Sequence, residues 1–264
     1  MYRPAASWVA ACLMMGTAAA DTAYVKPSSF SPDQGETITV EVAFNDYCCE
    51  PRYAVRTDTY EVIAPDGTSS APERVESFAK MTVLEHTITV PGTTRVSTGE
   101  RLGRKGEYVL LDGAYHLVNS PDADPITVPE GTPILSSQTA TVTDAYVTVG
   151  TPDWGAIRTS VGRLAIEPAL HPDSARVGGL FIGRVMMDGA PVAHKTVLVT
   201  NEVQRVNQAG GTLSKTDEDG IFTVSFTEPG THLIMVRLQA PAPAGAETDI
   251  RSYTTALTLQ VAPD

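Results

Sequence analysis

Hydrophobic and polar residues alternate along most of the chain with a period of two residues. The segments 38–44, 84–90 and 253–261 each place mostly apolar side chains at every second position. This spacing is typical of β-strands that bury one face and expose the other. The sequence therefore predicts a mainly β protein whose strands form antiparallel β-sandwiches.

Two local signals refine this prediction. Asp112 and Gly113 separate two strand-like segments, and this dipeptide suits the positive φ angles of a two-residue hairpin loop. Pairing across that loop places His116 opposite Val109. Helical periodicity is rare, and residues 71–81 are the one place where we expect a short helix.

A second turn signal lies at residues 217–220. Its sequence, Asp-Glu-Asp-Gly, begins like a calcium loop, but no acidic residue follows at the spacing of the closing ligand. We therefore expect a tight turn in which Gly220 takes a positive φ angle.

A stretch rich in proline and glycine divides the chain. Residues 168–179 contain Pro168, Pro172 and the pair Gly178-Gly179 between two regions dense in strand patterns. We therefore expect an N-terminal β domain over residues 21–167 and a C-terminal domain over residues 178–264. The latter has roughly six or seven strand patterns at short spacing, which is typical of an immunoglobulin-like β-sandwich.

Residues 1–20 have the pattern of a secretory signal peptide. Arg3 is the only charged side chain among them, an apolar stretch follows, and three alanines precede Asp21. We expect cleavage before Asp21 and a mature protein in the periplasm. No later segment is long and apolar enough to predict a membrane-spanning helix, so we expect no membrane insertion of the mature chain.

The charge balance excludes several classes of partner. The chain has 31 acidic and 19 basic residues and a net charge of -12. Binding to nucleic acid or to anionic lipid requires a basic surface, so neither is expected. Catalytic motifs such as Gly-x-Ser-x-Gly, His-Glu-x-x-His and phosphate-binding glycine loops are also missing from the sequence. We therefore expect a protein that is not an enzyme.

Cys48 and Cys49 are adjacent in the sequence, which is the most unusual local feature. In an oxidising periplasm we expect them to form a disulfide bond. Such a bond would be a local cross-link or a redox-labile bridge. Two reduced thiolates would instead supply soft ligands for a metal ion.

The five histidines show no metal-binding spacing. His86 and His232 share the face of apolar neighbours in their strand patterns, so we expect them in the core or at a sheet edge. His171 and His194 fall in predicted turns, where they can reach solvent. Because imidazole is the commonest metal ligand, these two and His116 remain candidate ligands in a cluster formed by folding.

Several short segments, in the same order, are similar to a family of exported bacterial proteins of unknown function. That family is grouped with periplasmic components of nickel and cobalt uptake (NikM-like or CbiK-like). The matching segments are residues 24–30, 35–40, 64–67, 145–147, 150–152, 164–168, 188–192, 216–222, 229–233 and 252–255. The resemblance implies an N-terminal β domain, a C-terminal immunoglobulin-like domain and a role in handling transition metals in the cell envelope.

One position departs from the family pattern. Many relatives begin the mature chain with a histidine, whose imidazole and free amine can hold a metal. Here the matching residue is Asp21, a hard oxygen ligand that suits nickel or cobalt less well.

Two functions follow from these observations. The first is an accessory protein that binds a divalent transition metal, nickel or cobalt, beside an envelope uptake system. Its candidate ligands are Asp21, Cys48, Cys49, His116, His171 and His194. The second is a metal-free β-sandwich module that offers an edge strand or loops to an envelope partner, such as an outer-membrane receptor.

Overall fold

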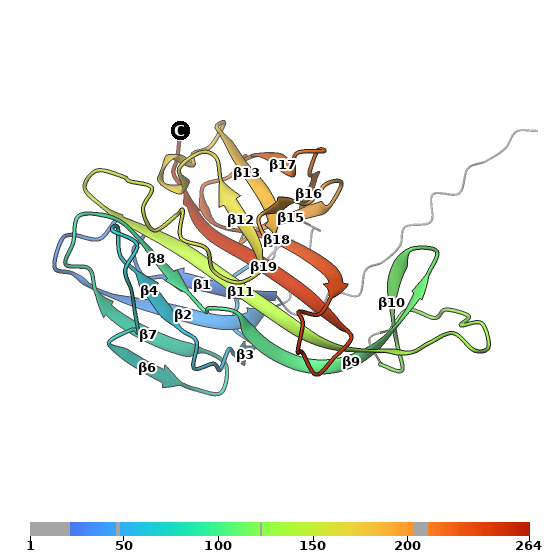
Figure 1. Ribbon diagram of the computed structural model, residues 1–264. Coiled ribbons are helices and arrows are strands. Elements are labelled where there is room, and N and C mark those ends of the chain that lie inside the picture. The colour runs from blue at the N-terminus through green and yellow to red at the C-terminus, as the bar shows by residue number, and fades with distance from the viewer. Residues whose placement is uncertain (1–21, 46–47, 122, 203–210) are drawn as a thin grey trace, which may run out of the picture.

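The computed structural model describes residues 22–45, 48–121, 123–202 and 211–264 (Figure 1). The predicted signal peptide and Asp21 lie outside the described residues. In the part of the chain that is described, no helix is long and apolar enough to cross a membrane. The strands are β1 (Thr22–Pro27), β2 (Thr37–Asn45), β3 (Tyr53–Ala54), β4 (Glu61–Ile63), β5 (Ser69–Ser70), β6 (Arg74–Ser77), β7 (Thr82–Thr87), β8 (Gly92–Ser97), β9 (Arg101–Leu111), β10 (Ala114–Val118), β11 (Leu135–Val149), β12 (Leu164–Pro168), β13 (Leu180–Met187), β14 (Ala190–Pro191), β15 (Thr196–Asn201), β16 (Thr212–Lys215), β17 (Ile221–Ser225), β18 (Gly230–Pro241) and β19 (Ile250–Val261), with a 3-10 helix, η1 (Pro172–Ser174), between β12 and β13.

These strands form three sheets. The central sheet has ten strands, in the order β16-β15-β18-β19-β11-β8-β4-β5, with β9 and β10 attached beside β11. The first outer sheet contains β1, β2, β3, β6 and β7, and the second outer sheet contains β12, β13, β14 and β17. Strand pairs are antiparallel except that β11 and β19 run parallel. The prediction of a mainly β protein built from antiparallel β-sandwiches, the C-terminal one immunoglobulin-like, is confirmed.

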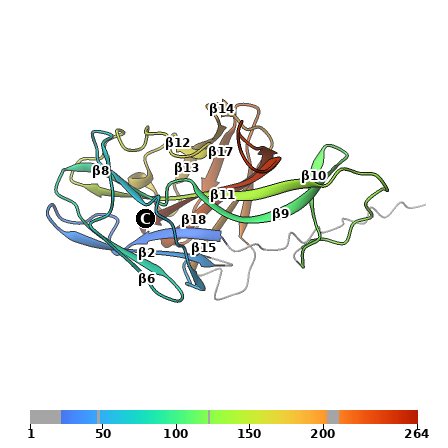
Figure 2. The same cartoon turned by 60° about the horizontal axis from the view of Figure 1, so that its bottom comes forward.

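Both faces of the central sheet are covered, which gives three layers (Figure 2). On β11, Ala145 and Val147 join the core under the first outer sheet, whereas Tyr146 joins the core under the second. On β19, Leu257 and Leu259 also belong to the second core. Residues 140–149 of β11 are therefore all buried, as expected for a strand that is covered on both sides.

The central sheet crosses the predicted division of the chain. Residues 137–145 of β11 pair with residues 250–258 of β19. β12 precedes the proline- and glycine-rich stretch but pairs with β13, which follows it. Whether the two segments fold as independent domains stays a prediction.

The local turn signals were correct and the short helix was not. Asp112 and Gly113 have φ angles of 50° and 78°, and Gly220 has a φ angle of 74°. His116 pairs with Val109 across the hairpin. Residues 74–77 form the edge strand β6 rather than a helix, because pairing with β7 supplies their backbone hydrogen bonds and overrides local propensity.

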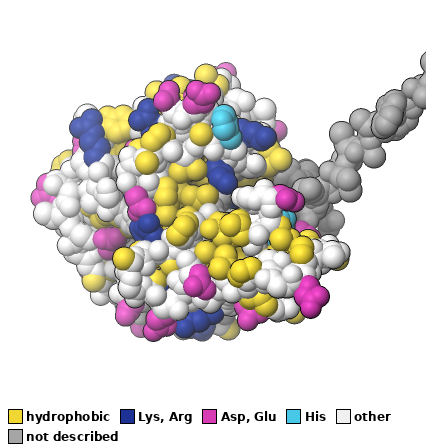
Figure 3. All heavy atoms as spheres, turned by 45° about the vertical axis from the view of Figure 1, so that its right-hand side comes forward, with side chains coloured by type: hydrophobic (Ala, Val, Ile, Leu, Met, Phe, Trp, Pro, Cys, Tyr) yellow, Lys and Arg dark blue, Asp and Glu magenta, His cyan; other side chains and the backbone are white. Residues whose placement is uncertain are grey.

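The hairpin of β9 and β10 extends from the body of the molecule as an arm (Figure 1). Leu102 and Leu110 of this arm are exposed, as is Ile134, which precedes β11. Figure 3 brings this side forward and shows hydrophobic side chains gathered on it among scattered charges.

Candidate functional site

A cleft of about 640 Å³ lies between residues 154–163, which follow β11, and the strands β12 and β13. It therefore lies where the two sandwiches meet. Its apolar lining includes Trp154, Ile157 and Met186, and its charged lining includes three arginines. We call residues 154–163 the cleft loop.

A buried ion pair lies at the base of the cleft loop. Arg95 of β8 and Asp144 of β11 are both almost completely buried. The Nε and Nη2 atoms of Arg95 donate hydrogen bonds of 2.9 and 2.5 Å to the two carboxylate oxygens of Asp144. Burial alone would lower the pKa of Arg95, but the carboxylate of Asp144 outweighs this effect, so the pKa lies above its ordinary value. Arg95 therefore stays charged and also donates, through Nη1, to the carbonyl oxygen of Thr159 at 2.7 Å.

The start of the cleft loop is fixed by a second set of contacts. Asp153 accepts hydrogen bonds from the backbone N–H groups of Thr93 and Gly155, each at 2.9 Å. A Cβ atom at Gly155 would lie 1.7 Å from the carbonyl oxygen of Pro65, so only glycine fits there. Together with the bond from Arg95 to Thr159, these contacts hold the loop at its start and at its middle.

The opposite wall of the cleft is an open sheet edge. β12 pairs with β13 alone. The N–H of Asp188 donates to the carbonyl of Arg163, and the N–H of Ala169 donates to that of Ile182. Because hydrogen-bonded and non-hydrogen-bonded pairs alternate in an antiparallel ladder, the backbone N–H and C=O of Leu164 and Ile166 point away from β13.

No described part of the chain pairs with this edge. Ile166 is among the residues that line the cleft. Its side chain packs in the core under the second outer sheet. The cleft therefore presents unpaired backbone groups of β12 beside apolar side chains.

The arginines of the cleft differ in their pairing. The Nε and Nη2 atoms of Arg163 donate to the carboxylate of Asp188 at 2.7 and 2.5 Å, and its Nη1 donates to the hydroxyl of Tyr253. The hydrogen bond from Arg163 lowers the pKa of Asp188, so this pair stays ionised near neutral pH. Arg158 is exposed and forms no ion pair with any described residue.

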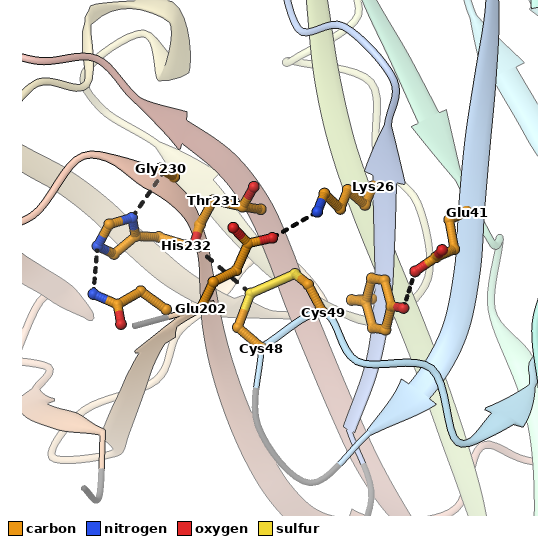
Figure 4. The surroundings of a disulfide bond; sticks show 10 residues. Lys26, Glu41, Cys48, Cys49, Glu202, Gly230, Thr231 and His232 are labelled. Carbon is orange, nitrogen blue, oxygen red and sulfur yellow. Dashed lines mark hydrogen bonds and ion pairs between the residues drawn. A yellow bond between two sulfur atoms is a disulfide. The ribbon is translucent and has the colours of Figure 1, made fainter. Parts of the chain in front are cut away.

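Cys48 and Cys49 form a disulfide bond (Figure 4). Neither cysteine lines the cleft. Cys48 is fully buried and Cys49 is 9% exposed. The Sγ atom of Cys48 lies 3.8 Å from the carbonyl oxygen of Thr231 on β18. The two cysteines pack with Leu233 and Met235 of the same strand. The disulfide therefore packs the segment that follows β2 against the face of the central sheet.

The three candidate histidines lie apart from this disulfide and from one another. His116 is half-buried on β10 in the arm, and His194 is exposed in the turn before β15 with a φ angle of 57°. His171 sits beside the cleft loop, where both ring nitrogens are engaged. Its Nε2 lies 2.9 Å from the carbonyl oxygen of Asp153, and its Nδ1 accepts from the N–H of Asp173 at 3.2 Å.

The described residues do not form the predicted metal site. Among them, no three histidine, cysteine or acidic side chains lie close enough to hold one ion. The cysteine sulfurs are bonded to each other and are not available as thiolates. Asp21 lies outside the described residues, so its contribution stays a prediction.

Sequence reasoning missed the cleft. Arg95 and Asp144 are 49 positions apart, and no local pattern links them. Arg158 stands in a segment without strand periodicity, and the free edge of β12 is visible only once its single pairing partner is known.

The architecture defines an immunoglobulin-like β-sandwich protein with a cleft between its sandwiches. The chain belongs to the family of the domain of unknown function DUF4198, whose sequence model matches residues 18–240. The resemblance to a family of unknown function is thus confirmed, and its link to nickel and cobalt uptake stays a prediction. No match to a curated protein was found by sequence.

Two solved structures are weakly similar to this chain. The D0-D1 domain of intimin is 14% identical, with 89% of this chain and 96% of that chain covered and a TM-score of 0.22. The IgVJ-C2 molecule of amphioxus is 13% identical, with 88% and 99% covered and a TM-score of 0.20. Similarity at this level says nothing about what the chain binds.

Proposed function

We propose that this protein is a non-enzymatic interaction module of the cell envelope that binds an extended segment of a protein partner. The observation that carries the proposal is the open edge of β12 in the cleft. An unpaired strand edge recognises an extended peptide through backbone hydrogen bonds, and neighbouring pockets select its side chains.

The dimensions of the cleft support this mode of binding. Its volume of about 640 Å³ lies within the usual range for ligand sites. β12 has five residues, and a strand rises about 3.3 Å per residue. A peptide strand of similar length therefore fits along the edge, with Trp154 and Met186 available for apolar contacts.

The chemistry of the cleft supports a binding role over catalysis. Its lining residues include neither histidine nor cysteine. Asp188 is held by Arg163, and the hydroxyl of Thr159 donates to the carbonyl of Gly155 at 3.3 Å. Thr159 and Asp188 of the lining are therefore both engaged by other groups of the protein.

The proposed location is the periplasm. Residues 1–20 have the composition of a signal peptide. A disulfide bond such as that between Cys48 and Cys49 persists in oxidising compartments. An envelope uptake system or an outer-membrane receptor is the class of partner that this location favours.

The test uses the mature chain, residues 21–264, and a phage-displayed library of short linear peptides. We expect enrichment of peptides that bind in the extended conformation. The variant Ala165→Trp fills the cleft from the outer face of β12 and should abolish their binding. The matched control is Leu180→Trp, which adds the same side chain at an exposed position of β13 outside the cleft and should leave binding unchanged.

Two results would overturn the proposal. One is a selection that enriches no peptide on the folded mature chain. The other is a set of enriched peptides whose affinities are equal for Ala165→Trp and the unaltered protein.

A further inference from the structure

We infer that the segment bound in the cleft carries a carboxylate side chain and that Arg158 is the residue that selects it. This inference rests on the proposed function, because it names the chemistry of the segment that adds to β12.

The charges of the cleft leave one cation without a partner. Arg95 is neutralised by Asp144, and Arg163 by Asp188. Arg158 is exposed and has no ion-pair partner among the described residues. Arg158 is therefore the arginine of the cleft lining whose charge no described carboxylate neutralises.

The second acidic residue of the cleft lining, Glu167, forms no ion pair with Arg158. Glu167 is exposed on β12, and its direct cross-strand neighbour on β13 is Arg184. Opposite charges at directly paired positions of a sheet attract each other. Glu167 therefore has a basic neighbour on its own sheet. The negative charge of Glu167 also disfavours a ligand carboxylate near β12 at the Glu167 end of the cleft.

The position of Arg158 is fixed before any ligand arrives. Its backbone N–H donates to the carbonyl of Trp154 at 3.1 Å. The next residue, Thr159, accepts the hydrogen bond from buried Arg95. A guanidinium on such an anchored loop can form two parallel hydrogen bonds to a carboxylate, which makes the contact both strong and directional.

The experiment compares the charge preference of the selected peptides across variants. The unaltered protein should enrich peptides with Asp or Glu at one position. Replacing that acid by its amide in a synthetic peptide should weaken binding about tenfold, the usual effect of losing a hydrogen bond to a charged group. Arg158→Gln should remove this difference, and Arg158→Glu should favour Lys or Arg at the same position.

The matched control is Arg176→Gln, which removes an exposed arginine that does not line the cleft. It should keep the acidic preference. Both substitutions are at exposed positions, and equal midpoints of thermal unfolding will verify that the variants fold.

The outcomes separate this inference from the proposed function. One outcome is that Ala165→Trp blocks binding but the acid and amide forms of a peptide bind with equal affinity. This result overturns the role of Arg158 and leaves the proposed binding module intact. An acid preference that survives in Arg158→Gln has the same meaning. A selection that yields no cleft-dependent peptide overturns the proposed function itself.

Discussion

Arg95 and Asp144 form a two-pronged ion pair in the interior, with donor–acceptor distances of 2.9 and 2.5 Å. The pair joins neighbouring strands β8 and β11, and Arg95 extends the connection to Thr159 in the cleft loop. Arg95 also lies 5.7 Å from the centre of the ring of Tyr146. The side chain of Arg95 therefore holds the cleft loop, one wall of the cleft, against the central sheet.

Removing one member of this pair should destabilise the protein. We expect Arg95→Met to lower the free energy of unfolding by about 3–5 kcal/mol, because the carboxylate of Asp144 would remain buried without a partner. Urea denaturation measures this change. The double variant Arg95→Met/Asp144→Leu should recover most of the loss, and a single variant within about 1 kcal/mol of the unaltered protein would contradict the prediction.

The disulfide predicts the thiol content of the mature protein. Cys12 lies in the predicted signal peptide, so Cys48 and Cys49 are the only cysteines of residues 21–264. We expect no reactive thiol in the denatured, unreduced protein and two after reduction. Two reactive thiols before reduction would show that the pair is reduced in the mature protein and would restore it as a candidate metal or redox site.

His232 should make stability depend on pH. Burial lowers its pKa. Its Nδ1–H donates to the carbonyl of Gly230 at 3.2 Å, and its Nε2 accepts from the amide of Asn201 at 3.3 Å. The folded protein therefore holds a neutral ring, whereas the unfolded chain takes up a proton near the ordinary pKa of about 6.5.

Because the unfolded state binds more protons in this range, stability should fall as the pH drops below about 6.5. Urea denaturation at about pH 7.5 and about pH 5.5 measures the loss. The variant His232→Asn should lose less stability between these two conditions. His86, whose pKa is also lowered by burial, remains in both proteins and serves as a common background. Equal losses in the two proteins would contradict the assignment to His232.

His171 is expected to stabilise the cleft loop rather than bind a metal. His171→Ala removes the hydrogen bonds to Thr93 and Asp153 and the edge-on contact with Trp154. We expect a loss of about 1–3 kcal/mol in the free energy of unfolding. Calorimetric titration of the chelator-stripped protein with nickel or cobalt should be the same for both proteins, and micromolar binding that disappears in the variant would contradict this prediction.

The shared sheet should make the two sandwiches unfold together. β19 pairs with β11 over nine residues, and β12 belongs to the second outer sheet. We therefore expect one transition in differential scanning calorimetry of the mature chain. Cleavage within residues 168–179 that leaves a C-terminal fragment with its own cooperative transition would show instead that the predicted domains are independent.

The sequence was informative where structure depends on neighbouring residues. The alternation of Ile38, Val40 and Val42 predicted a buried strand face, and each of the three is buried. Asp112 and Gly113 predicted their own turn because positive φ angles depend on the residue itself.

Features that depend on distant pairing could not be predicted in this way. Residues 74–77 became a strand because β7 offers an edge. The cleft exists because the cleft loop and β12 are both placed by the central sheet, whose strands come from both halves of the chain. The open groups of Ile166 and the unpaired Arg158 are visible only in that arrangement.

The continuity between β11 and β19 also determines how a partner would arrive. One wall of the cleft follows β11 in the chain, and the other packs on β19, so both walls are supported by two strands that pair with each other in the central sheet. We therefore expect the cleft to keep its width when a partner binds, so that the loss of conformational entropy falls mainly on the incoming segment. Association should then proceed in a single kinetic phase, at a rate proportional to the concentration of the partner. The fraction of time that the free segment spends extended should limit the association rate constant.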